Sequence, residues 1–326
     1  MRFLRRLGPY FLLVFIIATG VTFWFRHDEL FDWIAQRNYQ PSDQVQQLAA
    51  ETGMTPKSQR LFYVNRPVVE GKDSFNKHCV NPPDQVSTLG CFTGNRLGIY
   101  IYDVTDPRLY GVEQVTAAHE MLHQAYLRLN KTDKNRIDML LQDFYDSQLS
   151  DQTVKDQLQT YTTSEPGQLV NEMHSILGTE IANLPPELET YYRQYFVDRG
   201  KVVQYYAKYQ GEFTQRNQQI KDYDAQLDVL KAQIEANKKD LDSREKTLQE
   251  QHALLDTYRS NDQIAEYNSA VPGYNALVTT YRGEVNETNR LIAQYNDLLS
   301  TRNSIAVQER QLQQALNSRV DNASEQ

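Results

Sequence analysis

The sequence is short of positive charge. Of its 326 residues, 34 are Lys or Arg and 42 are Asp or Glu, which gives a formal net charge of -8 at pH 7. Proteins that bind nucleic acids need a stripe or patch of basic side chains to meet the phosphates, and no such stripe is visible along this chain. The charge balance therefore argues against a nucleic-acid partner and is typical of a water-exposed protein.

Cysteine is almost absent, since Cys79 and Cys91 are the only two. A single pair twelve residues apart lacks the close Cys-x-x-Cys spacing of zinc sites, which argues against a metal centre built on thiolates. Outside the cytoplasm the environment is oxidising, so there we expect a disulfide between Cys79 and Cys91. Two free, buried thiols are the alternative.

Long apolar runs are confined to one place, between Leu7 and Phe25. As a helix, this run would be about 30 Å long and would span one bilayer core. Arginines precede it and acidic residues follow it, so the N-terminus is predicted to be cytoplasmic and the rest of the chain extracytoplasmic. The alternative is a cleaved signal peptide and a secreted protein, because Ala18 and Gly20 offer a small-x-small cleavage site.

Secondary-structure signals change along the chain. Residues 60–69 (RLFYVNRPVV) and 96–104 (RLGIYIYDV) are rich in β-branched and aromatic side chains and are predicted to be strands. Apolar residues recur at helical spacing in 111–130, and the pattern stays mostly helical to about residue 203.

The composition then shifts to a heptad pattern typical of coiled coils. One apolar seam runs through 220–255 and a second, out of phase, through 264–299. An antiparallel hairpin of two helices explains the change of phase, and a turn containing Pro272 and Gly273 is expected between them. A single kinked rod that dimerises is the alternative, because heptads alone do not fix orientation.

These signals together predict an α+β fold with a small β-sheet, active-site helices, a long coiled-coil helical hairpin and an N-terminal transmembrane helix. The predicted parts are a membrane anchor or signal peptide (1–27), a helical stalk (28–54), a catalytic domain (55–203), the coiled-coil hairpin (204–318) and a disordered tail (319–326).

The segment AAHEMLHQAY contains the residues that indicate a catalytic metal site. His119 and His123 are four residues apart, so on a helix their rings emerge from one face, close enough to share a metal ion. Zinc favours neutral imidazole and carboxylate ligands, and it makes water acidic enough to attack near neutral pH. Glu120 lies beside that face, where it can accept a proton from the attacking water.

A catalytic zinc ion needs a third protein ligand. The downstream segment GQLVNEMHSILGTEIANLP offers three candidates, Glu172, His174 and Glu180. Each has apolar neighbours at helical spacing, so periodicity leaves all three open.

The motif HEMLH followed by NEMHSILGT resembles the gluzincin metallopeptidases, in particular the thermolysin-type pattern with an Asn-Glu-x-x-Ser helix. The resemblance implies a zincin-like domain in which His119, His123 and Glu172 bind zinc and Glu120 is the general base. Ile176 stands where the family has an Asp that orients a ligand histidine, so another acceptor is needed, and Glu180 is the candidate. Residues 96–104 resemble the family's edge strand, which binds extended substrate.

The function expected from these features is an extracytoplasmic, membrane-anchored zinc metallopeptidase that hydrolyses peptide bonds with one zinc ion. Its partners would be a peptide or protein substrate, the membrane, and a protein or second copy bound through the coiled coil. Two alternatives are a coiled-coil interaction protein with a structural or degenerate zinc site, and a zinc amidase acting on cell-wall peptides. Several tyrosines, among them Tyr161, Tyr191 and Tyr192, are candidates to stabilise the oxyanion.

Overall fold

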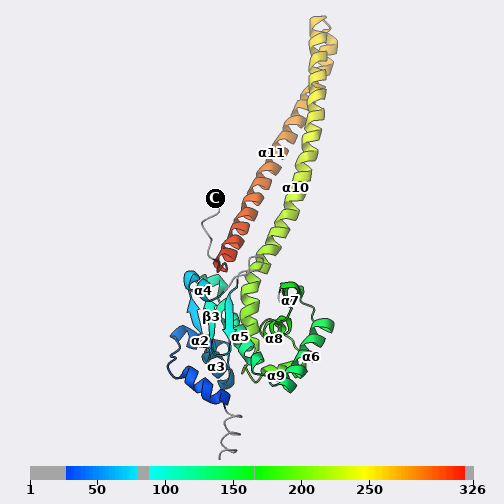
Figure 1. Cartoon of the computed structure of the whole chain (residues 1–326). Helices are drawn as coiled ribbons and strands as arrows, with labels where there is room; N and C mark the ends of the chain where they lie inside the picture. Colours follow the sequence, from blue (N-terminus) through cyan, green and yellow to red (C-terminus); the bar gives the residue numbers. More distant parts are fainter. Residues whose placement is uncertain (1–26, 80–87, 165, 320–326) are drawn as a thin grey trace, which may run out of the picture. The chain divides into compact units, whose positions relative to one another are not determined.

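The computed structural model describes residues 27–79, 88–164 and 166–319. They form two compact units (Figure 1). The first unit contains the described residues up to Gly211 and those from Leu312 onward, and the second unit is Glu212–Gln311.

The prediction of an α+β fold is wrong, because the described residues are mostly helical. After a helical segment at 27–36, the elements are α2 (Asp43–Glu51), α3 (Pro56–Tyr63), β1 (Val68–Glu70), α4 (Lys72–His78), β2 (Gly90–Gly94), β3 (Gly98–Tyr102), the 3-10 helix η1 (Pro107–Leu109), α5 (Val112–Leu127), α6 (Lys131–Ser147), α7 (Gln152–Ser164), α8 (Leu169–Glu180), α9 (Pro186–Tyr192), α10 (Gly200–Ser260) and α11 (Ile264–Ala315). The three strands are short and make one small sheet.

The first predicted strand, residues 60–69, is divided, because residues 60–63 belong to helix α3 and only residues 68 and 69 belong to strand β1. Thr55 caps this helix by accepting a hydrogen bond from the Ser58 amide, and Pro56 occupies its first turn. Leu61 and Phe62 are buried on it. The apolar cluster that suggested a strand therefore packs a short helix into the core, and β1 keeps only the end of the predicted segment.

The predicted membrane segment lies outside the described residues, apart from residue 27. No helix in the described part of the chain is long and apolar enough to cross a bilayer. Residues 28–54 do not stand apart as a stalk, because α2 contributes Val45, Leu48 and Ala49 to the core of the first unit. The predicted tail, 319–326, also lies outside the described residues except for Arg319.

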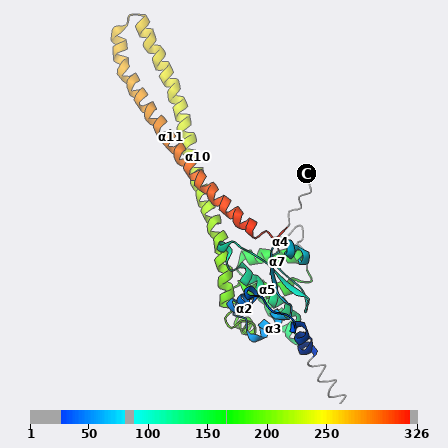
Figure 2. The ribbon, with the colours of Figure 1, turned by 90° about the vertical axis from the view of Figure 1, so that its left-hand side faces the viewer.

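Helix α5 lies at the centre of the first unit. It packs against α2, α3, β2 and β3 on one side and against α8 on the other (Figures 1 and 2). Val115, Ala118, Met121 and Leu122 are all buried, as expected of a helix that is enclosed by neighbours. The helix starts after Gly111, whose φ of 118° favours glycine.

The sheet has the order β1-β3-β2, with β1 parallel and β2 antiparallel to β3. The predicted disulfide is confirmed, since Cys79 at the end of α4 is bonded to Cys91 on β2, with their Cα atoms 5.8 Å apart. The bond therefore joins strand β2, which lies against α5, to α4.

In the second unit, α10 and α11 run antiparallel to each other. Asp224 pairs with Arg302 at 2.9 Å and Arg244 pairs with Glu284 at 2.6 Å, which fixes one register along the two helices. The turn lies at 261–263. Pro272 lies inside α11 and does not end it.

The close packing of α8 on α5 depends on Gly178. A Cβ at this position would lie 2.6 Å from Leu122 Cδ1 and 2.7 Å from Tyr192 Cε1, whereas a Cβ at Gly211 meets nothing within 4 Å. We predict that Gly178→Ala lowers the free energy of unfolding by about 1–3 kcal/mol through overpacking. The matched change Gly211→Ala should raise it by up to about 1 kcal/mol, because alanine favours the helix.

Urea denaturation followed by near-ultraviolet circular dichroism measures both changes, since the first unit contains a cluster of buried tyrosines. Equal stability of Gly178→Ala and the wild-type chain would show that α8 and α5 are not in close contact.

Candidate metal centre

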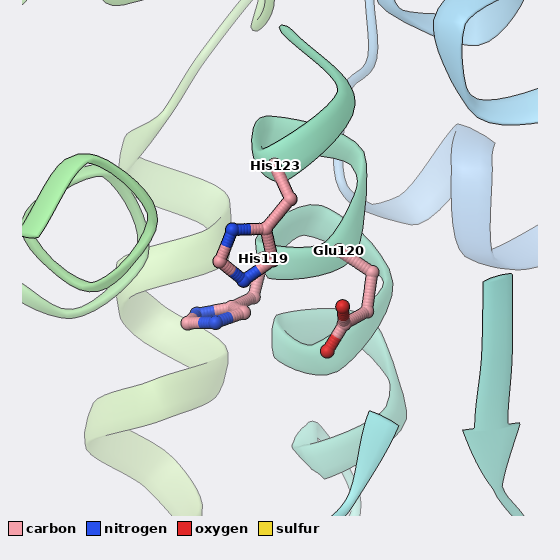
Figure 3. A group of neighbouring side chains, drawn as sticks. All are labelled: His119, Glu120 and His123. Carbon is pink, nitrogen blue, oxygen red and sulfur yellow. The ribbon is translucent and has the colours of Figure 1, made fainter. Parts of the chain in front are cut away.

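His119 and His123 project from the same side of α5 (Figure 3). One helical turn separates them, and their ring centroids are 4.7 Å apart. Their side chains are 16% and 9% exposed. Both rings are thus largely removed from water while retaining some contact with it, as the ligands of a catalytic metal ion require.

Glu172 reaches the same place from the first turn of α8. Its Oε2 atom lies 3.5 Å from Nε2 of His119, and its Oε1 atom lies 3.6 Å from Nε2 of His123. Burial alone would raise the pKa of the Glu172 carboxyl, but the two histidines and a hydrogen bond from Tyr161 together hold that pKa below its usual range. Of the three candidate third ligands, Glu172 is the one whose carboxylate faces both histidines.

The two separations between the Glu172 carboxylate and the histidine nitrogens suit a shared zinc ion. They are longer than an ordinary N–H···O hydrogen bond, which is about 2.7–3.2 Å. Two ligands of one tetrahedral zinc ion, with bonds of about 2.0–2.1 Å, are roughly 3.4 Å apart. Glu172 Oε2 is also buried without a hydrogen-bond partner, which is costly for a carboxylate unless a cation satisfies it. The residues present therefore fit the metal.

His123 is held in a fixed orientation by the helix that carries Glu172. Its Nδ1 atom lies 3.0 Å from Asn171 Oδ1 and 3.3 Å from Ser175 Oγ. Since an amide oxygen only accepts hydrogen bonds, Nδ1 carries the proton and donates it to Asn171. The lone pair of the neutral ring is therefore on Nε2, which faces Glu172.

The general-base candidate, Glu120, is on the side of α5 that faces β2. Its side chain is buried, and it accepts a hydrogen bond from the backbone amide of Phe92. Its carboxylate lies within 4.8 Å of the coordinating nitrogens of both histidines. Burial, supported by the nearby charge of Glu172, raises the pKa of Glu120 to about 7, which is near the optimum for proton transfer at neutral pH.

Strand β2, not β3, borders this carboxylate. A Cβ at Gly90 would lie 2.7 Å from Glu120 Oε1 and 2.4 Å from Thr116 Cγ2, so only glycine leaves the carboxylate in place. The expectation that residues 96–104 form the edge strand is wrong, because β3 pairs with strands on both sides. The edge next to the centre belongs to β2, which the sequence pattern did not identify as a strand.

The other two third-ligand candidates have different surroundings. His174 is fully buried, and burial lowers its pKa to about 3, so it stays neutral. Its Nε2 atom lies 2.8 Å from the Tyr191 hydroxyl. Burial raises the pKa of Glu180 to about 7, against the charge of His119 and hydrogen bonds to Tyr206 and Gln157. The role expected of Glu180 at a ligand histidine is filled at His123 by Asn171.

The hydroxyls of two of the three tyrosines considered for the oxyanion already make hydrogen bonds inside the core. Tyr191 bonds to His174, as above, and the Tyr192 hydroxyl donates to the backbone carbonyl of His174 at 2.7 Å. Tyr161 on α7 hydrogen-bonds to the carboxylate of Glu172. It is therefore the one whose hydroxyl is beside the metal ligands.

Comparisons with known proteins add no relative. No protein-family model, no curated protein and no solved structure matches the chain. The resemblance to gluzincins therefore depends on the motif residues themselves and on the geometry in which they meet.

The hydrogen bond from His123 to Asn171 generates a prediction about metal affinity. Asn171→Leu keeps a similar volume but removes the acceptor, leaving Ser175 as a more distant partner. We expect zinc affinity to fall roughly 10- to 100-fold, as is typical when such an orienting partner is removed. Asn171→Asp keeps an acceptor and should retain tight binding. Competition with a chromophoric chelator measures both, and unchanged affinity in Asn171→Leu would refute the orienting role.

Proposed function

We propose that the chain is a zinc metallopeptidase that acts outside the cytoplasm, with one Zn2+ held by His119, His123 and Glu172. The observation that carries the proposal is the carboxylate of Glu172, which faces the Nε2 atoms of both histidines at 3.5 and 3.6 Å. Two distant segments of the sequence would thereby supply the three protein ligands that a catalytic zinc ion takes.

When bound, zinc supplies a Lewis acid that polarises a peptide carbonyl and lowers the pKa of water. Glu120 accepts the proton of the attacking water on its carboxylate, since burial gives it a pKa of about 7. It then donates that proton to the nitrogen of the leaving amine. The Phe92 amide keeps the carboxylate beside the histidines throughout.

Strand β2 suggests how a peptide is held. In the described part of the chain, β3 is its one partner strand, so the other edge of β2 can pair with an extended segment. Such a segment would pass close to Glu120, which contacts both Gly90 and Phe92 on β2. This favours an extended peptide as substrate.

A purely structural zinc site is less well supported. Structural zinc takes four protein ligands, commonly cysteines. Cys79 and Cys91, the only cysteines of the sequence, are bonded to each other. The same disulfide supports a location outside the cytoplasm, where such bonds persist. Whether the chain is anchored or secreted, and whether the coiled coil binds a partner, stay predictions from the sequence.

Glu120→Gln tests the catalytic role directly. The amide keeps the size of the side chain but cannot accept the proton, so we expect peptide cleavage to fall roughly 100- to 10,000-fold with zinc content unchanged. Glu113→Gln is the matched control, because Glu113 lies two turns earlier on α5 and bonds to the Val104 amide and Gln44. It should keep both zinc and activity.

Cleavage of extended peptides by the wild-type chain, measured with zinc content by mass spectrometry, is the reference for these variants. Undiminished cleavage by Glu120→Gln, or a wild-type chain that binds no zinc, would overturn the proposal. Activity limited to cell-wall peptides would instead indicate a zinc amidase.

The assignment of the third ligand has its own test. We predict that Glu172→Ala lowers zinc affinity by more than the roughly 100-fold expected for loss of an orienting residue, because it removes a direct ligand. Glu180→Gln, a neutral isostere on the same helix, should keep zinc. Chelator competition distinguishes the two variants. The reverse order of affinities would transfer the ligand role to Glu180.

A further inference from the structure

The helical segment 27–36 is attached to the first unit by its acidic side. Asp28 and Asp32 are one turn apart, and Asp32 is only 7% exposed. Arg96 donates to Asp32 Oδ1 at 2.8 Å and to Asp28 Oδ1 at 2.6 Å, and Arg128 donates to Asp32 Oδ1 at 2.6 Å. Ion pairs, not apolar packing, therefore fix this helix to the protein.

The large apolar side chains of the same helix face outward. Leu30, Phe31, Trp33 and Ile34 are 43%, 44%, 60% and 50% exposed. A surface helix of a globular protein normally buries its apolar stripe and exposes its charges. Here the arrangement is reversed, and contiguous exposed apolar surface of this kind marks a contact with lipid or with another protein.

Three observations favour lipid. The helix directly follows the apolar run from Leu7 to Phe25 in the sequence. The guanidinium of Arg37 lies 5.8 Å from the centre of the Trp33 ring, and Arg66, also exposed, donates to the carbonyl of Ala35. Tryptophan and arginine side by side suit the boundary between acyl chains and anionic headgroups.

The β2–β3 turn extends this surface. Arg96, in the turn, lies over the ring of Phe31 at 5.6 Å, and the next residue, Leu97, is 70% exposed. The exposed apolar side chains are thus not confined to the helix, and the body of the first unit also presents one.

We propose that Leu30, Phe31, Trp33, Ile34 and Leu97 form a lipid-docking surface by which the first unit rests on an anionic bilayer. The proposal depends on the extracytoplasmic location proposed above and on the membrane anchor predicted from the sequence, but not on zinc or peptide cleavage. Docking would orient the candidate metal centre relative to the membrane. Arg128 is the C-terminal cap of α5, the helix that carries both histidines, and Arg96 lies in the turn after β2. Because both arginines bind Asp32, the docked helix is attached to the two elements that border the centre.

Tryptophan fluorescence tests the docking, because Trp24 and Trp33 are the only two tryptophans. In the full-length chain, Trp24→Phe leaves Trp33 as the single reporter. Reconstituted in vesicles of phosphatidylcholine and phosphatidylglycerol, Trp33 should lose most of its emission to lipids brominated near the headgroup and resist quenching by iodide. Ready quenching by iodide would overturn the proposal. Protection from both quenchers would also overturn it, because a protein would then cover the face.

A second reporter separates docking of the unit from simple tethering by the preceding residues. Trp24→Phe/Trp33→Phe/Leu97→Trp should be quenched by the same brominated lipids. The control Trp24→Phe/Trp33→Phe/Met139→Trp places the reporter at a 67% exposed apolar position on α6, outside the surface, and should be quenched by iodide instead. Equal quenching of the reporters at 97 and 139 would refute the docking surface. None of these readouts depends on cleavage, so the two proposals fail separately.

Discussion

The close approach of α8 to α5 is the constraint on which the candidate metal centre depends. A set of zinc ligands has to meet within roughly 3.4 Å of one another, and the ligands come from two helices far apart in the sequence. Gly178 permits that approach, since any side chain there would meet Leu122 and Tyr192. Arg199 supports it from the far end of α8, where its guanidinium donates to the carbonyls of Ile181 and Ala182.

Charge balance points to the same conclusion as geometry. Glu120, Glu172 and Glu180 are largely removed from water, and each is close enough to His119 or His123 for their charges to interact. Buried carboxylates are costly unless they are protonated, paired or bound to a cation. Burial raises the pKa of Glu120 and Glu180, whereas the rings of His119 and His123, together with Tyr161, hold the pKa of Glu172 below its usual range. A divalent cation between those rings would complete the balance.

The sequence predicted those features of the site that depend on residues close together in the chain. The spacing of His119 and His123 is enough to place both on one face, and the isolated pair of cysteines predicted the disulfide that the structure contains. Contacts between distant segments were not accessible in this way. Phe92 and Thr93 favour a strand, but glycines at both ends of residues 90–94 weaken the pattern, and the close contact of Gly90 with Glu120 is visible only in the folded chain. The role of Asn171 likewise appears only when α8 is packed on α5.

The helix at 27–36 shows why a periodic pattern does not by itself give the direction in which a face points. Its sequence separates Asp28 and Asp32 from the apolar side chains, which predicts an amphipathic helix but not which side meets the protein. The usual preference is overridden because Arg96 and Arg128 present cations where the helix attaches. An ion pair that is exposed to water contributes little to stability, whereas a partly buried one contributes more. The ion pairs of this helix are of the second kind, because Asp32 is buried. The cost of leaving four large apolar side chains exposed is removed only if something apolar covers them, and the proposed docking on lipid would supply that cover.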